Sequence, residues 1–320
     1  MTRDEFIGRV KEELLETLPV ELTKNLDIQE MNVLKSNDQE HHGLTFKRGE
    51  NEAAPTIYLD DAYARFTEGE DLHTLTEELK DAYLGSLGTR EPQKMELDFE
   101  RIKDNLTVRL LEIKRNRGYL ANTPYMTVGN GLAMVCDIKM EDGIEGTWRA
   151  TVTQSMLESQ NYDKRELFMV AMDNAQHLDP PILVDMNQAL FAREGENLML
   201  RTEPLPSDEV DKMYILSNTA GMLGSAALFY PGTREHVAEL LGESYSVLPS
   251  SQHEVLTIPD SAGIPREDLA GMVRSANETV VEPKDVLSDN IFHFDRDEKK
   301  FELVTPQAEK GSIVAESGRC

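Results

Sequence analysis

A hydroxyl, an imidazole and a carboxylate lie close together in the stretch LPSSQHEV, residues 248–255. Ser250 and Ser251 could supply a nucleophile, His253 a general base, and Glu254 a carboxylate. Hydrolases use these residue types to attack esters and phosphoesters. These four residues are therefore the candidate catalytic residues of the chain.

The spacing of the four residues favours a structural interpretation. Catalytic triads are assembled from separate segments of a fold, and this sequence lacks the glycine-flanked nucleophile elbow of the α/β-hydrolases. Pro249 and the serines are typical of a turn between two strands, with His253 at the start of the second strand. We expect a turn here and keep hydrolysis as an alternative.

No second chemical motif accompanies this group. The sequence has no His-Glu-x-x-His helix, no Cys-x-x-Cys pair, no phosphate loop and no Gly-x-Gly-x-x-Gly. His41 and His42 lie near Asp38 and Glu40 in a polar stretch that we expect to be a loop. Two adjacent histidines without a second pair of ligands define no closed zinc site. We therefore predict neither a metal site nor a cofactor.

The catalytic candidates belong to the most apolar stretch of the chain, residues 213–260. Met213–Leu216 and Ala226–Tyr230 are short apolar runs separated by glycines, and this pattern predicts a hairpin. A helix capped by Thr233 and ended by Gly242 should follow. A helix lying across a hairpin buries the apolar faces of both elements.

The rest of the chain alternates between strand-like and helix-like patterns. Thr2 and Glu5 have the spacing of a capping box and should start a helix that ends at Pro19. Met169 and Met172 lie at helical spacing, where we expect them to fill the core. A short helix and then a strand are expected within residues 99–113. The other expected strands are residues 26–34, 43–46, 54–59, 131–138, 146–152, 291–294 and 301–304, and the other expected helices residues 60–66, 71–87, 163–179 and 265–277.

Strand pairs followed by helices predict an α+β protein. Its mixed or antiparallel sheets should be built of hairpin-plus-helix units with the helices packed on one face. We expect an N-terminal α+β unit over residues 1–89, with a joint at Thr89–Lys94, and a main α+β unit over residues 95–304 that contains two hairpin-helix modules. Residues 305–320 have little to bury and are expected to form a disordered tail.

A formal net charge of −26 limits the partners of this chain. A field of that sign repels phosphate backbones and anionic lipid, which disfavours nucleic acid and membrane surfaces as partners. The basic stretch Arg101–Arg117 follows an acidic stretch over residues 50–100, and the opposite charges should face each other or solvent. No segment has the apolar length of a signal peptide or a bilayer span.

The cysteine content favours a reducing compartment. Cys136 and Cys320 are the two cysteines of the chain, which is too few for a disulfide framework. We therefore expect a cytoplasmic protein. The sequence gives no indication of its oligomeric state.

Four separated phrases support a comparison with a known family: APTIYLD at residues 54–60, AALFYPG at 226–232, LPSSQHEV at 248–255 and NETVVEPKDVLSD at 277–289. In that order they resemble the bacterial domain-of-unknown-function family 5688, over most of the chain up to about Asp295. The resemblance implies a bacterial cytoplasmic protein. Because the family brings no established activity, it assigns no catalytic residue.

The leading hypothesis from the sequence is a non-catalytic protein-binding or regulatory module. Packing signals account for the distinctive residues, and no catalytic motif is assembled. The alternative is a hydrolase that uses Ser250 or Ser251 with His253. A third hypothesis is an acidic mimic of nucleic acid that binds basic proteins.

Overall fold

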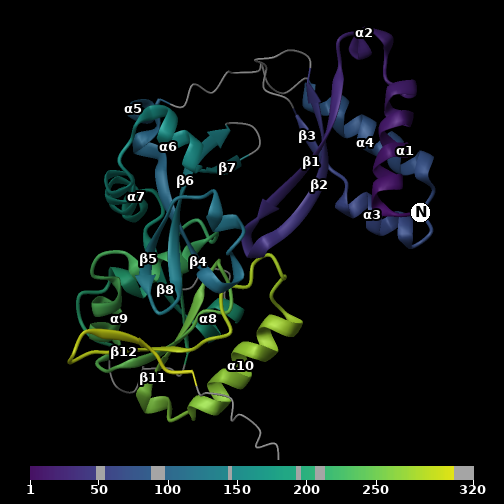
Figure 1. Ribbon diagram of the computed structural model, residues 1–320. Coiled ribbons are helices and arrows are strands. Elements are labelled where there is room, and N and C mark those ends of the chain that lie inside the picture. Colours follow the sequence, from purple (N-terminus) through teal and green to yellow (C-terminus); the bar gives the residue numbers. More distant parts are fainter. Residues whose placement is uncertain (48–54, 88–97, 143–145, 192–195, 206–212, 306–320) are drawn as a thin grey trace, which may run out of the picture. The chain divides into compact units, whose positions relative to one another are not determined.

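The protein folds into two compact units of α+β structure (Figure 1). The computed structural model describes residues 1–47, 55–87, 98–142, 146–191, 196–205 and 213–305. The first unit is Met1–Asp98 and the second is Phe99–Cys320. The expected joint at Thr89–Lys94 lies outside the described residues, as does the expected tail beyond Thr305. Every described strand pair is antiparallel, which confirms the predicted α+β class.

The first unit packs helices against a three-stranded sheet of order β1-β2-β3. In chain order its elements are α1 (Arg3–Thr17), α2 (Val20–Thr23), β1 (Asp27–Lys35), the 3-10 turn η1 (Ser36–Asp38), β2 (Gln39–Lys47), β3 (Thr56–Tyr58), α3 (Asp60–Thr67) and α4 (Leu72–Leu87). The predicted first helix is confirmed, and Thr2 and Glu5 form its capping box.

The β1-β2 hairpin is longer than its sequence pattern predicts. Its turn lies at Asn37 and Asp38, whose φ angles are 61° and 49°. Asparagine and aspartate visit this left-handed region more readily than other non-glycine residues. His41 and His42, which we expected in a loop, therefore lie in β2. Farther along β2, Phe46 stacks on Tyr83 of α4 with ring centroids 4.0 Å apart.

The second unit begins with a four-stranded sheet in which β6 pairs with β4, β5 and β7. The first elements are α5 (Phe99–Ile102), η2 (Lys103–Asn105), β4 (Leu106–Glu112), η3 (Ile113–Arg115), η4 (Tyr119–Ala121), β5 (Tyr125–Gly129), β6 (Leu132–Asp142), β7 (Gly146–Thr151), α6 (Gln154–Gln160) and α7 (Lys164–Leu178). The predicted hairpin of β6 with β7 is confirmed. Thr153 or Ser155 could open the short helix that follows β7, and the structure shows Thr153 as the cap of α6. The cap that Asp163 predicts for α7 is confirmed.

The same unit contains a six-stranded sheet of order β13-β12-β10-β11-β9-β8. The remaining elements are β8 (Pro181–Asp185), α8 (Met186–Phe191), η5 (Leu198–Leu200), β9 (Tyr214–Asn218), η6 (Gly224–Phe229), α9 (Thr233–Leu241), β10 (Tyr245–Leu248), β11 (Val255–Pro259), η7 (Asp260–Ala262), α10 (Arg266–Thr279), β12 (Phe292–Asp295) and β13 (Lys300–Leu303). The predicted hairpin near the C-terminus is β12 with β13.

Helices lie on both faces of the six-stranded sheet, whereas we expected them on one. Leu248 of β10 packs in a cluster with Leu269 and Val273 of α10. On the opposite face of the same strand, the hydroxyl of Tyr245 donates to the Arg234 carbonyl of α9 at 3.2 Å. All four residues of β10 are buried. A strand buried on both faces requires cover on both faces.

The predicted hairpin of Met213–Leu216 with Ala226–Tyr230 is wrong. The first run forms β9, which pairs with β8 and β11. The second run lies in the 3-10 helix η6, all of whose residues are buried. A short apolar run that is buried on every side has no periodicity to separate strand from helix. The capping prediction for Thr233 is also wrong, because Gly232 precedes α9 and Thr233 is its first residue.

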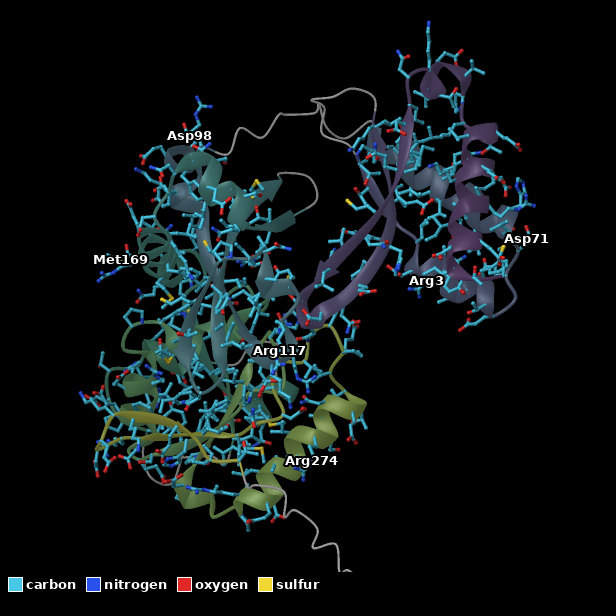
Figure 2. All side chains as sticks on the ribbon, viewed as in Figure 1. Arg3, Asp71, Asp98, Arg117, Met169 and Arg274 are labelled. Atoms are coloured by element: carbon cyan, nitrogen blue, oxygen red, sulfur yellow. The ribbon has the colours of Figure 1, made fainter. Side chains whose placement is uncertain are left out.

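Met169 shows a second difference from the sequence prediction. Its side chain projects away from α7 (Figure 2) and is 64% exposed. The buried face of α7 consists of Leu167, Phe168, Ala171 and Ala175. These four residues lie at helical spacing and form one buried face of α7. Met169 lies outside that face.

Glu112, at the end of β4, connects the four-stranded sheet to the C-terminal part of the unit. Its Oε1 accepts hydrogen bonds from Ser288 Oγ at 2.7 Å and from Asn290 Nδ2 at 2.9 Å. Its Oε2 lies 3.2 Å from Arg115 Nε. A buried carboxylate is tolerated when it is paired and hydrogen-bonded in this way.

Gly224 lies where η6, β9 and the loop between β10 and β11 meet. Its N–H donates to the His253 carbonyl at 2.9 Å. A Cβ at this position would lie 2.3 Å from Ser217 Oγ, 2.6 Å from Asn218 N and 2.7 Å from the His253 oxygen. Two of these atoms belong to the backbone, so they cannot rotate away. The close approach therefore requires glycine.

We predict that Gly224→Ala lowers the free energy of unfolding by about 3 kcal/mol, because the new methyl group overpacks a buried junction. The matched control is Gly271→Ala within α10, where a Cβ would meet nothing within 4 Å. The control should be neutral or stabilise by up to about 1 kcal/mol through helix propensity. Urea unfolding of both variants measures the difference, and equal stabilities would contradict the close-packing argument.

Candidate functional site

The four candidate residues lie in the loop that joins β10 to β11. These strands pair antiparallel, so the predicted turn between two strands is confirmed. Ser251 is buried, Ser250 and His253 are half-buried, and Glu254 is exposed. The structure thus brings the four residues into one loop but gives them different surroundings.

Two segments from elsewhere in the chain hold this loop. On one side, Leu287 N donates to the Ser250 carbonyl at 2.9 Å, and Gln252 N donates to the Asp285 carbonyl at 2.8 Å. On the other side, Ser225 Oγ donates to the Gln252 carbonyl and Ser217 Oγ to the His253 carbonyl, both at 2.8 Å. The loop backbone is therefore fixed from both sides.

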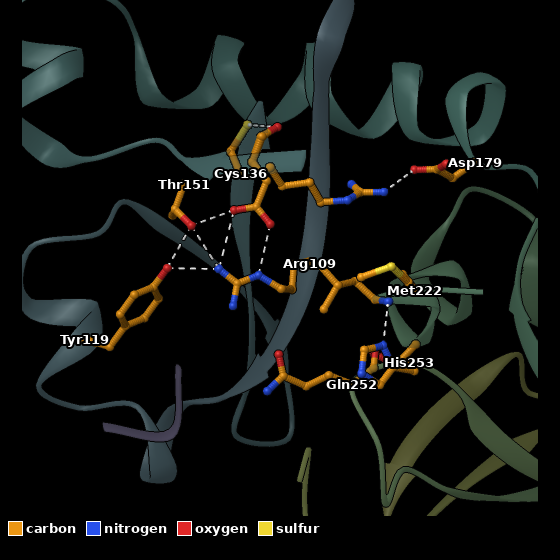
Figure 3. Close-up of polar contacts among 12 residues, drawn as sticks. Arg109, Tyr119, Cys136, Thr151, Asp179, Met222, Gln252 and His253 are labelled. Carbon is orange, nitrogen blue, oxygen red and sulfur yellow. Dashed lines mark hydrogen bonds and ion pairs between the residues drawn. The ribbon is translucent and has the colours of Figure 1, made fainter. Parts of the chain in front are cut away.

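Both nitrogens of the His253 ring face protein groups, and Figure 3 shows the contact at Nδ1. The backbone N–H of Leu223 donates to Nδ1 at 3.1 Å. A backbone N–H can only donate, so Nδ1 carries the lone pair and, in the neutral ring, Nε2 carries the proton. Nε2 lies 3.4 Å from Asp285 Oδ1. A histidine beside an aspartate is half of a catalytic triad, but here a backbone N–H stands where the nucleophile would be.

Ser251 is hydrogen-bonded to the loop backbone and not to the His253 ring. Ser251 Oγ accepts a hydrogen bond from the backbone N–H of His253 at 2.9 Å, so it serves the loop backbone. In the described part of the chain, no hydroxyl group forms a hydrogen bond with the His253 ring. The ring lone pair that a general base needs is already occupied by Leu223.

Sequence reasoning missed a buried ionic network on the four-stranded sheet. Arg109 of β4 donates from Nε to Asp137 Oδ2 at 2.9 Å, and from its terminal nitrogen to Thr151 Oγ1 at 3.0 Å and Tyr119 Oη at 2.9 Å (Figure 3). Burial opposes the charge of Arg109, but Asp137 more than offsets this, and the pKa of Arg109 is raised. We expected Arg109 at the surface with its basic neighbours. A charged residue inside an apolar strand pattern, as in LTVRLLE, was the available signal.

A second ionic group lies around Asp179, which follows α7 and is 1% exposed. Its Oδ1 accepts from Lys139 Nζ of β6 and its Oδ2 from a terminal nitrogen of Arg149 of β7, both at 2.7 Å. Asn218 and Tyr230 lie beside it. We call Lys139, Arg149, Asp179, Asn218 and Tyr230 the Asp179 cluster.

Three buried groups with nucleophilic potential are held in their protonated forms. Burial raises the pKa of the Cys136 thiol, and the neighbouring Asp137 raises it further. Burial likewise raises the pKa of the phenols of Tyr230 and Tyr245. Thiols and phenols attack as anions, so these environments suppress their reactivity.

The other histidines also have protein partners. His41 and His42 both contact Asp60, at 3.1 and 3.3 Å. His73, His177, His236 and His293 each contact a carboxylate or carbonyl oxygen. Among the residues that the structure describes, no group of three or more histidine, cysteine or acidic side chains could hold a metal ion.

Comparison with known proteins identifies the family of this chain. The chain belongs to the family of unknown function DUF5688, whose model matches residues 3–296. This match confirms the resemblance carried by the four sequence phrases. No curated protein and no solved structure matches the chain. Within the described ranges, no helix combines the length and the apolar character needed to cross a membrane.

We predict that His253→Ala lowers the free energy of unfolding by about 2 kcal/mol, because it leaves the Leu223 N–H without an acceptor. His253→Asn should lose less than about 1 kcal/mol, since an asparagine Oδ1 can occupy the position of Nδ1. Urea unfolding measures both effects. If asparagine destabilised as much as alanine, the acceptor role of Nδ1 would be wrong.

We also predict that Cys136 resists alkylation in the folded protein. In a Cys320→Ser background, iodoacetamide at pH 8 should modify Cys136 at least about 100-fold more slowly in buffer than in denaturing urea, because the buried thiol stays protonated. Mass spectrometry follows the reaction. Comparable rates in the two conditions would show that the thiol is accessible and reactive.

Proposed function

We propose that this DUF5688 member is a non-catalytic protein-binding module. The proposal rests on the observation that the groups that could react are hydrogen-bonded, buried or ion-paired within the protein. The His253 ring is occupied at Nδ1 by a backbone N–H, the Cys136 thiol is buried, and the carboxylates of Asp137 and Asp179 are ion-paired. These contacts support a structural role for each group.

The free edge of β1 is the surface that we propose for binding. β1 spans nine residues at the edge of the first unit's sheet. In the described residues, no segment other than β2 forms a backbone hydrogen bond with it. An exposed edge strand presents unpaired N–H and C=O groups, to which an extended segment of another protein can pair.

The edges of the six-stranded sheet differ from β1. At β8, the side-chain amide of Asn197 accepts from Leu183 N at 3.1 Å and donates to the Pro181 carbonyl at 3.4 Å. At β13, Asn130 Nδ2 donates to the Phe301 carbonyl at 3.1 Å. Asparagine side chains thus satisfy edge groups that would otherwise attract another strand. We therefore place the partner on β1.

The charge of the first unit specifies the partner further. Residues 1–98 contain 23 acidic and 11 basic residues. β1 itself carries Asp27 and Glu30, which are exposed. Electrostatic attraction then favours an extended segment rich in lysine or arginine, and attraction between exposed charges weakens as salt is added.

We predict that Glu30→Lys weakens capture of the partner at least about tenfold, because it reverses a charge on the binding edge and adds an edge lysine. The matched control is Glu16→Lys on α1, an exposed position with the same charge change in the same unit. The control should change the affinity by less than about twofold. Co-purification from cells that express the protein at its native level identifies the partner, and calorimetry measures the affinities.

Three outcomes contradict the proposal. Recovery of no specific partner removes its basis. Equal losses in the two lysine variants would indicate general charge attraction, as the nucleic-acid-mimic hypothesis expects. Hydrolysis of an ester or phosphoester by the wild-type protein, lost in His253→Ala, would establish an enzyme instead.

A further inference from the structure

The Asp179 cluster carries an excess of positive charge in a strongly acidic protein. Lys139 and Arg149 are cross-strand neighbours on β6 and β7, so their side chains leave the same face of the sheet. Both reach Asp179, one at each carboxylate oxygen. Two cations and one carboxylate leave a net charge of +1. The two cationic side chains are 14% and 13% exposed, so solvent compensates this charge only in part.

The same cluster contains a hydrogen-bond acceptor without a donor. Asn218 is 2% exposed, and among the residues that the structure describes its Oδ1 has no hydrogen-bond partner. The amide orientation is fixed, because Nδ2 donates to the Met222 carbonyl at 3.1 Å and a flipped amide would place two oxygens together. Buried polar groups are normally satisfied, so an unsatisfied one indicates a ligand or a bound water.

The contacts of the backbone bring this acceptor to the cations. Asn218 ends β9 and pairs with Pro181, two residues after Asp179. The next residue, Thr219, donates its N–H to the Pro180 carbonyl at 2.9 Å. Tyr230 is buried, and its burial, together with the charge of Asp179, raises the pKa of its phenol.

The loop beside Asn218 is exposed to solvent. Thr219, Ala220, Gly221 and Met222 are exposed, and Met222 is 55% exposed. Gly221 and Leu223 have φ angles of 64° and 55°, a backbone conformation that leucine seldom adopts. The chain therefore turns sharply directly over the Asn218 amide, and its side chains point away into solvent.

We propose that the Asp179 cluster binds a small monoanion that carries its own hydrogen-bond donor, and a hydroxycarboxylate is the chemical class that fits. The carboxylate would lie against the unused donors of Arg149 and the ammonium of Lys139, as carboxylates do with guanidinium groups. The hydroxyl group would donate to Asn218 Oδ1. A monoanion neutralises the excess charge, whereas a dianion such as hydrogen phosphate would leave a net negative charge in the cluster.

Binding is tested with L-lactate as the probe, and acetate and hydrogen phosphate for comparison. Lactate should bind at least about fivefold more tightly than acetate, which lacks the donor. Hydrogen phosphate should bind no better than acetate. Nuclear magnetic resonance of the full chain gives the affinities, and lactate should shift the side-chain signals of Arg149 Nε–H and the Asn218 amide.

Arg149→Gln removes the excess charge while Asp179 keeps Lys139, so the variant should fold and should bind lactate at least about tenfold more weakly. Arg165→Gln is the matched control, because Arg165 is exposed on α7. It should bind as the wild type does. The side-chain shifts in the wild-type protein keep the proposal testable even if Arg149→Gln does not fold.

The proposal is overturned if none of the three probes binds saturably, if lactate and acetate bind equally, or if Arg149→Gln leaves lactate binding intact. A crystal structure with an ordered water on Asn218 Oδ1 that lactate does not displace would also overturn it. The site lies in the second unit and β1 in the first. Failure here and failure of the protein-binding proposal are therefore separate results.

Discussion

The second unit depends on the close approach of Gly224 to the His253 carbonyl. That oxygen accepts from Gly224 N at 2.9 Å and from Ser217 Oγ at 2.8 Å, and the ring of the same histidine accepts from Leu223 N. One residue of the β10-β11 loop thus holds the end of β9 and the start of η6 in place. The candidate residue His253 thus positions two neighbouring segments of the chain.

Buried charge positions the elements of this unit more than it stabilises them. Removing two opposite charges from water costs about as much as their attraction returns, so an ion pair such as Arg109 with Asp137 is weak evidence for stability. Its geometric effect is clearer, because Arg109 of β4 has partners on β6, β7 and η4 at once. Glu112 has the same effect between β4 and the segment at Ser288–Asn290. Misplacing any of these elements would leave a buried charge without its partner.

The sequence predicted elements where a local signal decides the structure. The capping box at Thr2 and the cap at Asp163 depend only on neighbouring residues, and both helices begin as expected. The sequence failed at Ala226–Tyr230, where an apolar run is buried on all sides and only its tertiary surroundings make it a 3-10 helix.

At the candidate site, too, the sequence predicted what local residues decide and missed what distant residues decide. The turn at residues 249–254 followed from its proline and serines. The role of His253 did not, because its partners Leu223 and Asp285 are 30 and 32 residues away in the chain. Nothing in the local sequence indicates which groups will face an imidazole ring. The charges within LTVRLLE and MVCDIK were the available signal of buried pairs, but which charges pair depends on the strand register.

Asparagine side chains complete the backbone hydrogen bonding of the second unit wherever regular structure stops. Asn197 does so along β8, Asn130 along β13, and Asn218 across the turn that ends at Met222. A side-chain amide carries both a donor and an acceptor, so it can replace a missing strand or close a loop. Asn218 differs from Asn197, because its buried Oδ1 has no donor within the described residues. β1 likewise differs from β8 and β13, because no side-chain amide covers its edge in the described residues. The two unsatisfied features differ in kind: a continuous backbone edge matches an extended chain, and a single buried acceptor matches a single small donor. Backbone groups at an edge retain access to water, whereas a buried acceptor does not. The unsatisfied group therefore costs more free energy at Asn218 than at β1, and a ligand would relieve a larger cost there.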